Sequence, residues 1–421
     1  AVARWVLPCR RPMVDGWKPT LAAAQARLSA VRPAAYASSR NFIDGAVTGL
    51  SPYITHSLLS LSDVLTAVND THALNVQHKF VFELGWRDYF RHVWKHRGDG
   101  ILASLHDGLL PDAGYASVLP QDIRNACTGV PAIDTAVRAL YATGTLHNHA
   151  RMWLASYVVH LRKVHWRAGA DWLYGHLLDG DLASNHLSWQ WVAGTFSNKP
   201  YLFNAENVAK YAPQRYHSPG TVIDTDYETL GDIAVHRAGV GSRPGLQSCL
   251  DLPEETPALI SAPADSTPDS IAAPAGYIRA TGPNDLKVIA HQPIRLVHPW
   301  MLGEAPPGGM HNIGLIHLPF HTQFPWSAAR WAWVLARMQS LCSAVFVGDG
   351  HEIAGALASA SQVTSTATLN PHYAALLRQL TTQLAPTPRL LPDPPRLCNS
   401  FSRFYDTARR SAGSLDELLQ R

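Results

Sequence analysis

Residues 177–191, LLDGDLASNHLSWQW, are the stretch that decides the fold of this chain. Asp181, Asn185 and Trp189 follow one another at intervals of four, so on a helix an acid, an amide and an indole would form one ladder. Trp191 would face another neighbour, because two residues turn a helix by about 200°. Ordinary amphipathic helices seldom carry this chemistry on one face, whereas a helix against a large aromatic cofactor could use all of it.

The bulk composition is that of a globular protein with a substantial core. The chain has 421 residues, of which 46% are hydrophobic and 16% charged, enough for two or three domains. A net charge of +3 is weak evidence for a polyanionic partner. The five cysteines are far apart and form no C-x-x-C pair, so we expect no metal site and a reducing, cytoplasmic compartment. The sequence has no uninterrupted apolar span of about 20 residues, so we expect no membrane crossing.

Hydrophobic periodicity divides the chain into three parts and predicts an α+β multidomain fold. Residues 1–215 carry apolar residues at three-to-four spacing, which predicts an all-helical domain with helices at 19–28, 60–69, 76–97, 133–141, 147–167 and 172–191. Residues 216–285 are rich in Pro, Ala and Ser, which predicts a linker or irregular segment. Residues 286–421 predict a small α/β domain of unknown role, with strands at 294–297, 313–318 and 344–347 and helices at 326–341 and 372–384.

Two further windows carry polar and aromatic residues at helical spacing. In residues 79–92, KFVFELGWRDYFRH, one helix face would present Phe80, Glu83, Trp86 and Arg87. In residues 143–156, TGTLHNHARMWLAS, one face would present Asn148, Arg151 and Met152. Each window alone also suits a solvated salt bridge or a buried polar cap.

A third window is a turn before a helix start. In residues 47–53, VTGLSPY, the hydroxyls of Thr48 and Ser51 and the backbone N–H groups could hold a phosphate. Alone, the window equally suits an ordinary helix N-cap.

In this order, the segments resemble the FAD-binding domain of the photolyase/cryptochrome family. The matching segments are YASSRNFIDGAVTGLSPY, ELGWRDYFRH, TGVPAIDTAVRAL, TGTLHNHARMWLAS and LLDGDLASNHLSWQWVAGT, which span residue 36 to about residue 203. The resemblance implies FAD inside an all-helical bundle. By that resemblance, the cofactor-binding positions are Tyr36, Thr48, Gly49, Leu50, Ser51, Phe80, Arg87, Asn148, Arg151, Asp179, Asp181 and Asn185.

The resemblance also implies a pocket for damaged DNA. Enzymes of this family that split cyclobutane pyrimidine dimers line that pocket with residue types matched here by Glu83, Trp86, Asn148, Met152 and Trp191. The implied function is light-driven repair, in which reduced, excited FAD gives an electron to a dimer flipped out of UV-damaged single- or double-stranded DNA. The implied DNA-binding residues are Arg40, Arg87, Trp86 and Trp191.

Three alternatives remain open at this point. (6-4) photolyases resemble the same domain but need histidines in that pocket, where Met152 takes the dimer-type position. A cryptochrome-like blue-light photoreceptor without repair activity is the second alternative, and another flavoprotein role is the third. The protein partner of a photoreceptor would be unknown.

Three departures from the family stand out. Trp189 matches the electron-relay tryptophan nearest the flavin and Trp166 the middle one, but Ile123 stands at the usual outer position, for which Trp153, Trp172 or Tyr157 could substitute. Only about 35 residues precede Tyr36, so the usual N-terminal antenna domain is missing from its normal place and a folate or deazaflavin antenna is doubtful. The α/β part could be a relocated antenna domain or something unrelated. His149 stands where a DNA-contacting arginine is common.

Overall fold

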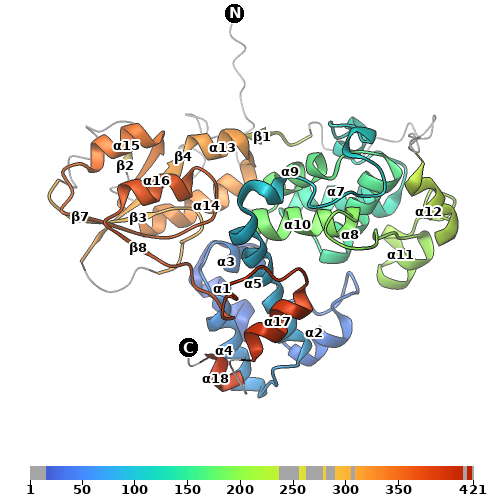
Figure 1. Cartoon of the computed structure of the whole chain (residues 1–421), viewed down its shortest axis with the longest axis horizontal. Helices are drawn as coiled ribbons and strands as arrows, with labels where there is room; N and C mark the ends of the chain where they lie inside the picture. The colour runs from blue at the N-terminus through green and yellow to red at the C-terminus, as the bar shows by residue number, and fades with distance from the viewer. Residues whose placement is uncertain are drawn as a thin grey trace, which may run out of the picture. The chain divides into compact units, whose positions relative to one another are not determined.

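The computed structural model describes residues 16–236, 256–261, 278–280, 290–304, 309–410 and 415–419. The chain divides into two compact units (Figure 1). The helical unit comprises Gln25–Thr55, Leu59–Pro257 and Pro388–Arg421. The sheet unit comprises Ala1–Ala24, His56–Leu58 and Ala258–Thr387.

This division differs from the predicted one at the C-terminal side. We predicted one α/β domain over residues 286–421, whereas Pro388–Arg421 belongs to the helical unit. The reason is α17 (Phe401–Arg409), which packs against α5 (Lys79–Arg97). Periodicity reveals that α17 is amphipathic but not which distant element its apolar face covers.

The predicted linker over residues 216–285 contains regular structure. The prediction of an irregular segment is wrong for α12 (Tyr227–Val235), which begins where the Asp226 side chain accepts the Thr229 N–H. Two short strands, β1 (Leu259–Ile260) and β2 (Ile278–Ala280), also fall within this range. The rest of the predicted linker, at 237–255, 262–277 and 281–285, lies outside the described residues.

The helical unit confirms the predicted all-helical character of the first half of the chain. Its central helix, α10 (Leu182–Ala193), packs against α5, α8 and α9, and four buried tryptophans share the surrounding core. The α-helices besides α5, α10, α12 and α17 are α1 (Leu21–Ser29, which begins in the sheet unit), α2 (Pro33–Ser39), α3 (Ser51–Thr55), α4 (Leu61–His72), α6 (Gln121–Arg124), α7 (Pro131–Thr143), α8 (Asn148–Ser156), α9 (Trp166–His176), α11 (Ala205–Tyr211) and α18 (Leu415–Leu419). Single turns are η1 (Gly98–Leu102), η2 (Asp112–Gly114), η4 (Gln214–Tyr216) and the π-helical η3 (Tyr157–Leu161).

Two predicted helices are each interrupted once. The helix predicted over 147–167 passes from α8 into η3 and ends before α9 begins at Trp166. The helix predicted over 172–191 breaks before α10, because Asp181 is the N-cap, and its carboxylate accepts the Ser184 N–H over 2.7 Å. The expected three-residue ladder is therefore wrong at its first position, and only Asn185 and Trp189 share the helix.

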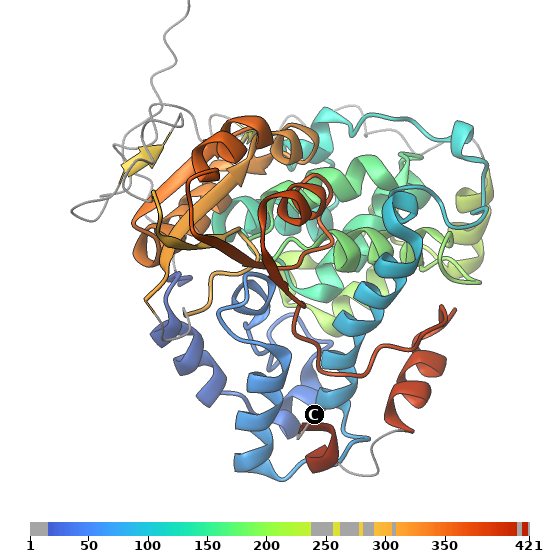
Figure 2. The ribbon, with the colours of Figure 1, turned by 60° about the vertical axis from the view of Figure 1, so that its left-hand side comes forward.

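The sheet unit is a doubly wound parallel sheet. Its strand order is β2-β6-β4-β3-β7-β8, which reverses direction between β3 and β7. All pairings in it are parallel, and helices lie in the crossovers from β4 to β6, from β6 to β7 and from β7 to β8. A separate antiparallel pair joins β1 to β5 (Figure 2). The remaining elements are β3 (Pro293–Val297), β4 (His311–His317), β5 (Trp326–Ser327), β6 (Ala344–Gly348), β7 (Gln362–Thr366), β8 (Gln383–Ala385), α13 (Leu318–Gln323), α14 (Ala328–Leu341), α15 (Gly350–Leu357) and α16 (Tyr373–Leu380).

The α/β character predicted for this part is present in the structure. The three predicted strands appear as β3, β4 and β6, and the helix predicted over 326–341 appears as α14. The helix predicted over 372–384 ends early, because α16 stops at Leu380 and β8 follows.

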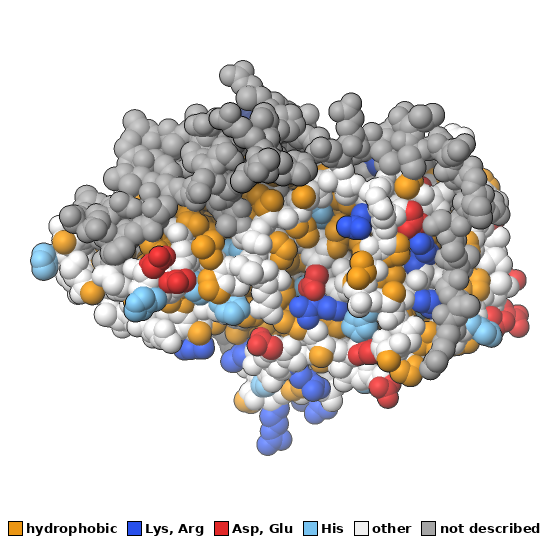
Figure 3. Space-filling model, turned by 90° about the horizontal axis from the view of Figure 1, so that it is seen from above, with side chains coloured by type: hydrophobic (Ala, Val, Ile, Leu, Met, Phe, Trp, Pro, Cys, Tyr) orange, Lys and Arg blue, Asp and Glu red, His pale blue; other side chains and the backbone are white. Residues whose placement is uncertain are grey.

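The described surface mixes charge signs with apolar side chains. Figure 3 shows acidic, basic and hydrophobic groups interspersed on the face that it presents. No helix within the described ranges is both long and apolar enough to cross a bilayer.

Candidate functional site

Arg87 on α5 lies at the centre of the predicted cofactor-binding residues. Its Nη1 donates to the Thr55 hydroxyl over 3.1 Å, and that hydroxyl donates to the backbone carbonyl of Asp179 over 3.2 Å. Its Nη2 lies 3.5 Å from the Ser51 carbonyl. Burial lowers the pKa of the Arg87 guanidinium, and the carboxylates of Asp181 and Asp179 oppose that shift. Arg87 thus ties α3 and α5 to the segment that precedes α10.

Asp179 also pairs with Arg151 on α8. The Arg151 Nη2 lies 2.9 Å from both carboxylate oxygens, and its Nε donates to the Leu146 carbonyl over 2.8 Å. The Asp179 side chain is only 6% exposed, against 26% for Arg151. Two guanidinium groups from different helices therefore converge on the carboxylates of one short segment.

The predicted phosphate-binding turn is present before α3. Gly49 has a φ of 61°, a left-handed conformation that glycine adopts without strain. The Thr48 hydroxyl accepts the Leu50 N–H over 3.3 Å, and Leu50 is buried. The turn leads into α3 at Ser51, the residue whose carbonyl faces Arg87.

Glu83 on α5 is held by two cations. Its Oε1 lies 2.9 Å from the Lys79 Nζ and 3.4 Å from the Arg40 Nε. Arg40 follows α2, whose Tyr36 ring meets the buried Phe80 ring edge-on at a centroid distance of 5.6 Å. An ion pair and a ring contact therefore join α2 to α5.

The predicted residues of α8 lie close to one another. The Asn148 Nδ2 lies 3.5 Å from the Met152 sulfur, and Asn148 is exposed. His149 instead stacks on Tyr211 at a centroid distance of 5.0 Å, and burial lowers its pKa. A packed imidazole whose pKa is lowered does not supply a positive charge at neutral pH, so His149 does not act as an arginine would.

Asn185 on α10 is fixed to the neighbouring helix. Its Nδ2 donates to the Ala170 carbonyl of α9 over 2.8 Å, and the residue is 8% exposed. This bond leaves the amide oxygen for another partner. The predicted place of Asn185 beside the flavin stays a prediction.

The two tryptophans predicted for the lesion pocket have different surroundings. Trp191 is 39% exposed and lies beside Tyr201 at a centroid distance of 6.0 Å. Trp86 is partly buried, and one face of its indole stacks on Phe401 of α17 at 4.1 Å and 10°. No hydrogen bond, ion pair or ring contact of the described residues joins either indole to Glu83, so a shared lesion pocket stays a prediction.

The two predicted relay tryptophans are both buried where α9 and α10 pack together, Trp166 on α9 and Trp189 on α10. The Trp189 indole lies over Gly169 so closely that a β-carbon there would be 2.3 Å from its Cη2. Trp166 precedes Gly169 by one turn, and its Nε1 donates to the Ser104 hydroxyl over 3.0 Å. Each indole is 2% exposed.

No outer relay residue is evident from ring contacts. Ile123 is completely buried, and among the described residues the Trp166 ring meets only His165, at 5.5 Å, and His186, at 6.2 Å. A substitute therefore stays a prediction for the three candidates, Trp153, Trp172 and Tyr157.

Gly169 leads to a first prediction. We expect Gly169→Ala to lower the free energy of unfolding by about 1–3 kcal/mol, because the buried indole of Trp189 must move to admit the methyl group. Guanidinium denaturation followed by tryptophan fluorescence measures this change. The matched control is Gly231→Ala in α12, where a β-carbon would meet open space and should stabilise the helix by about 0.5–1 kcal/mol. A gain of stability in both variants would contradict the described packing.

The donor and acceptor groups of this cluster fit FAD. Arg87 and Arg151 supply cationic donors, Asp179 and Asp181 supply carboxylate acceptors, and Asn185 supplies an amide. FAD carries the complementary groups, namely an anionic diphosphate, sugar hydroxyls, and ring carbonyls and an N–H.

Four residues of this region were not predicted from the sequence, namely Thr55, Lys79, Gly169 and Phe401. The Lys79–Glu83 ion pair could have been predicted from the sequence, because the two residues lie four apart on an expected helix. The other three act through contacts between elements that are distant in the sequence, which leave no local signal.

Comparison with known proteins agrees with the chemistry of the cluster. Residues 80–223 match the family described as the FAD binding domain of DNA photolyase. A deoxyribodipyrimidine photo-lyase of Streptomyces griseus is 34% identical over 211 residues, which are 46% of this chain and 45% of that protein. A chloroplastic/mitochondrial cryptochrome DASH of Ostreococcus tauri is 31% identical over 214 residues, which are 48% of this chain and 38% of that protein.

Among solved structures, a cryptochrome of Synechocystis sp. PCC6803 is similar, with a TM-score of 0.42 and 27% identity over 49% of this chain and 46% of that one. The chain spans less than half the length of the curated relatives that it matches here.

Proposed function

The chain carries an FAD-binding domain of the photolyase/cryptochrome family, with FAD as its cofactor, and from this premise we propose that it repairs DNA in light. The proposed substrate is a cyclobutane pyrimidine dimer, flipped out of single- or double-stranded DNA so that a cofactor-bound enzyme can reach it. Reduced FAD, when bound, supplies an electron in the light. The residues of this chain bind the lesion and orient it.

The observation that supports this proposal is that α5 and α8 each carry a predicted lesion-binding residue one turn before a predicted flavin-binding arginine. On α5, Glu83 lies one turn before Arg87, and on α8, Asn148 lies one turn before Arg151. Arg87 and Arg151 both face Asp179. The lesion-type residues of both helices therefore adjoin residues that converge on one proposed flavin-binding cluster.

Glu83 is the residue that we propose to accept a hydrogen bond from a pyrimidine. Its side chain is 30% exposed, and those of Lys79 and Arg40 are 38% and 23% exposed. Ion pairs with this much access to water contribute about 0–1 kcal/mol, so a base can replace one of the cations at little cost. Arg40 would then be available for a DNA phosphate.

The other proposed DNA contacts fall to the tryptophans. Trp86 and Trp191 pack against unstacked bases, which aromatic side chains bind without sequence preference. Arg87 was predicted for both the flavin and the DNA, and its bond to Thr55 and its position beside Asp181 and Asp179 favour the flavin role.

The test of the proposed function is dimer splitting. Purified protein with reduced FAD is mixed with an oligonucleotide that carries one thymine dimer and is exposed to blue light. We expect light-dependent recovery of the undamaged oligonucleotide, measured by chromatography. Dimers that persist while the flavin is photoreduced would reject repair and favour a light-sensing role.

The second prediction concerns Glu83. We expect Glu83→Gln to lower the light-dependent repair rate about tenfold, because an amide oxygen accepts a weaker hydrogen bond than a carboxylate. The matched control is Glu228→Gln on α12, which makes the same change of charge at an exposed site away from α5. Equal rates for the two variants would remove Glu83 from the proposed mechanism.

A further inference from the structure

The segment at residues 388–409 packs along α5 within the helical unit. The backbone N–H groups of Leu390 and Leu391 both donate to the Asp88 Oδ2, over 2.7 and 2.8 Å. Asp88 is fully buried on α5. Arg389 also donates to the Asp88 backbone carbonyl over 3.0 Å. The first residues of the segment are therefore anchored by hydrogen bonds to a residue that is shielded from water.

A histidine of α5 forms the second anchor. The His92 Nδ1 lies 2.7 Å from the Asp393 carboxylate, and its Nε2 accepts the Cys398 N–H over 2.9 Å. His92 is fully buried. With Nε2 as the acceptor, the ring proton lies on Nδ1, where it donates to Asp393. One imidazole thus fixes two points of the segment immediately before α17.

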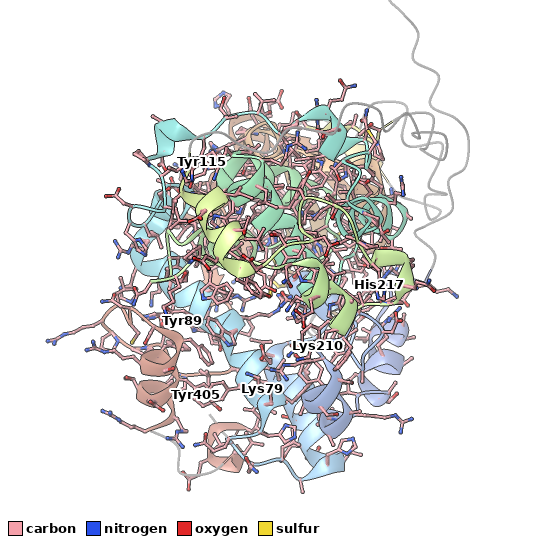
Figure 4. All side chains as sticks on the ribbon, turned by 90° about the vertical axis from the view of Figure 1, so that its right-hand side faces the viewer. Lys79, Tyr89, Tyr115, Lys210, His217 and Tyr405 are labelled. Carbon is pink, nitrogen blue, oxygen red and sulfur yellow. The ribbon has the colours of Figure 1, made fainter. Side chains whose placement is uncertain are left out.

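α17 then covers one side of α5 with aromatic rings. Its buried residues Phe401, Phe404, Tyr405 and Ala408 recur at helical spacing. Figure 4 shows Tyr405 and Tyr89 where the two helices lie side by side. A β-carbon at Gly85 of α5 would lie 3.2 Å from the Tyr405 ring, so the absence of a side chain there permits the close approach.

The closest ring contact in this interface is the one between Phe401 and Trp86. Their centroids are 4.1 Å apart and their planes differ by 10°, so the phenyl ring covers one face of the indole. Tyr89 and Phe90 meet the same indole at steeper angles, with centroids 5.7 and 5.5 Å away. Trp86 nevertheless remains partly exposed.

We propose that Phe401 is a positioning residue that holds the Trp86 indole in one orientation, so that the opposite face is ready to stack on an unpaired base. The proposal rests on the proposed function of Trp86. An indole without this support would rotate about two side-chain bonds and would lose that freedom on binding. The helix that carries Phe401 is anchored at Asp88 and His92. The side chain of Trp86 therefore loses its conformational freedom when the protein folds and not when DNA binds.

The same geometry has one competing interpretation, with the opposite sign. If Phe401 occupies the face that a base must use, α17 is a cover, and its removal would strengthen binding to DNA. Both anchors, Asp88 and His92, are fully buried. This favours a supporting role for α17, because a covering helix would have to detach before DNA binds. The experiment below separates the two by the direction of the change.

The experiment compares Phe401→Ala, Phe401→Tyr and Phe404→Ala in the full chain with FAD bound. Phe404 is buried on the same helix, and among the described residues its ring meets Tyr89 and His92, so its truncation weakens α17 without removing the stack on Trp86. Far-UV circular dichroism and flavin content identify variants that remain folded. Affinity is measured in the dark by fluorescence anisotropy, with labelled oligonucleotides that carry a thymine dimer or no lesion.

We expect Phe401→Ala to weaken binding of the dimer oligonucleotide about 3- to 10-fold and to leave the undamaged one unchanged. Phe401→Tyr should retain wild-type affinity for the dimer oligonucleotide. Phe404→Ala should weaken that affinity less than Phe401→Ala does. In a Trp86→Ala background, Phe401→Ala should have no further effect on the dimer oligonucleotide. Stronger binding after Phe401→Ala, or the same loss in both backgrounds, would overturn the proposal.

A second readout needs no DNA, so it separates this proposal from the proposed function. Acrylamide quenching compares the wild type with Phe401→Ala, each with and without Trp86→Phe, to isolate the emission of Trp86. We expect Phe401→Ala to increase the quenching of Trp86 at least twofold, and an unchanged value would overturn the positioning role. If the quenching changes but the wild type has no preference for the dimer, the proposed function fails while Phe401 still orients Trp86.

Discussion

Asp179→Ala is expected to lower the free energy of unfolding by about 3 kcal/mol, because it leaves two guanidinium groups without their shared carboxylate. Arg151 pairs with Asp179 over 2.9 Å, and Arg87 lies in the field of the same group. The estimate lies at the low end for buried ion pairs, because Arg151 is 26% exposed and water can solvate part of it. The variant should also lose FAD, since the cluster would lose a carboxylate acceptor and the ion-pair partner that holds Arg151 in place.

Two measurements on the purified variant check this expectation. Guanidinium denaturation gives the change in the free energy of unfolding, and the ratio of absorbance at 450 and 280 nm gives the flavin content. The matched control is Asp44→Ala, which breaks an ion pair between Asp44 and Arg215 whose side chains are 65% and 60% exposed. We expect this control to cost less than about 0.5 kcal/mol and to retain FAD. Equal losses in the two variants would contradict a central role for Asp179.

Acidification from pH 6.5 to pH 4.5 is expected to lower the free energy of unfolding by several kcal/mol. Burial lowers the pKa of five histidines to about 4, namely His147, His160, His176, His298 and His317. The unfolded chain binds these protons near pH 6.5, whereas the folded chain does not until about pH 4. The free energy of unfolding therefore falls as pH falls through this window, by at most about 1.4 kcal/mol per pH unit for each histidine.

Burial raises the pKa of Asp88 and Asp134, so these two carboxyls oppose the histidine effect as pH falls, whereas Asp393 acts at lower pH. Burial alone would raise the pKa of Asp393, but hydrogen bonds from Lys95 and His92 lower it overall, so its stabilising contribution persists above its unfolded value and is lost below about pH 4. Denaturant midpoints between pH 7 and pH 4.5 measure the histidine contribution. A midpoint that stays constant over this range would contradict it.

His160 offers a direct check of the mechanism. Its Nε2 lies 2.9 Å from the Val192 carbonyl inside the helical unit. Glutamine can offer a donor at this site but cannot gain a proton, so His160→Gln should give a flatter pH dependence. An unchanged slope would assign the effect to other groups.

Local sequence signals predicted those parts of the fold that depend on neighbouring residues. The helix expected over 76–97 appears as α5, and its polar face carries Glu83 and Arg87 as periodicity indicates. The expectation of FAD is confirmed by the family match over residues 80–223, because several short motifs in a fixed order are far more specific than any one of them.

The predictions that the structure contradicts, and the contacts that were not predicted, have physical causes that the local sequence pattern does not determine. Asp181 fits the three-residue ladder, but aspartate is also a preferred N-cap residue, and in the structure it caps α10. Phe401 and Trp86 are about 300 residues apart, so their stack depends on the route of the chain through the sheet unit. Sequence periodicity identifies an apolar face but not the element that covers it.

The return of the chain to the helical unit at residue 388 has a consequence for biosynthesis. The ribosome completes α5 about 300 residues before it completes α17. At roughly 5–20 residues per second, the aromatic side of α5 waits about 15–60 s for its covering helix. During that interval the side chains of Phe82, Trp86 and Tyr89 lack their partners on α17 and can associate with other nascent chains. A chaperone that binds these three aromatic side chains would therefore raise the yield of folded protein.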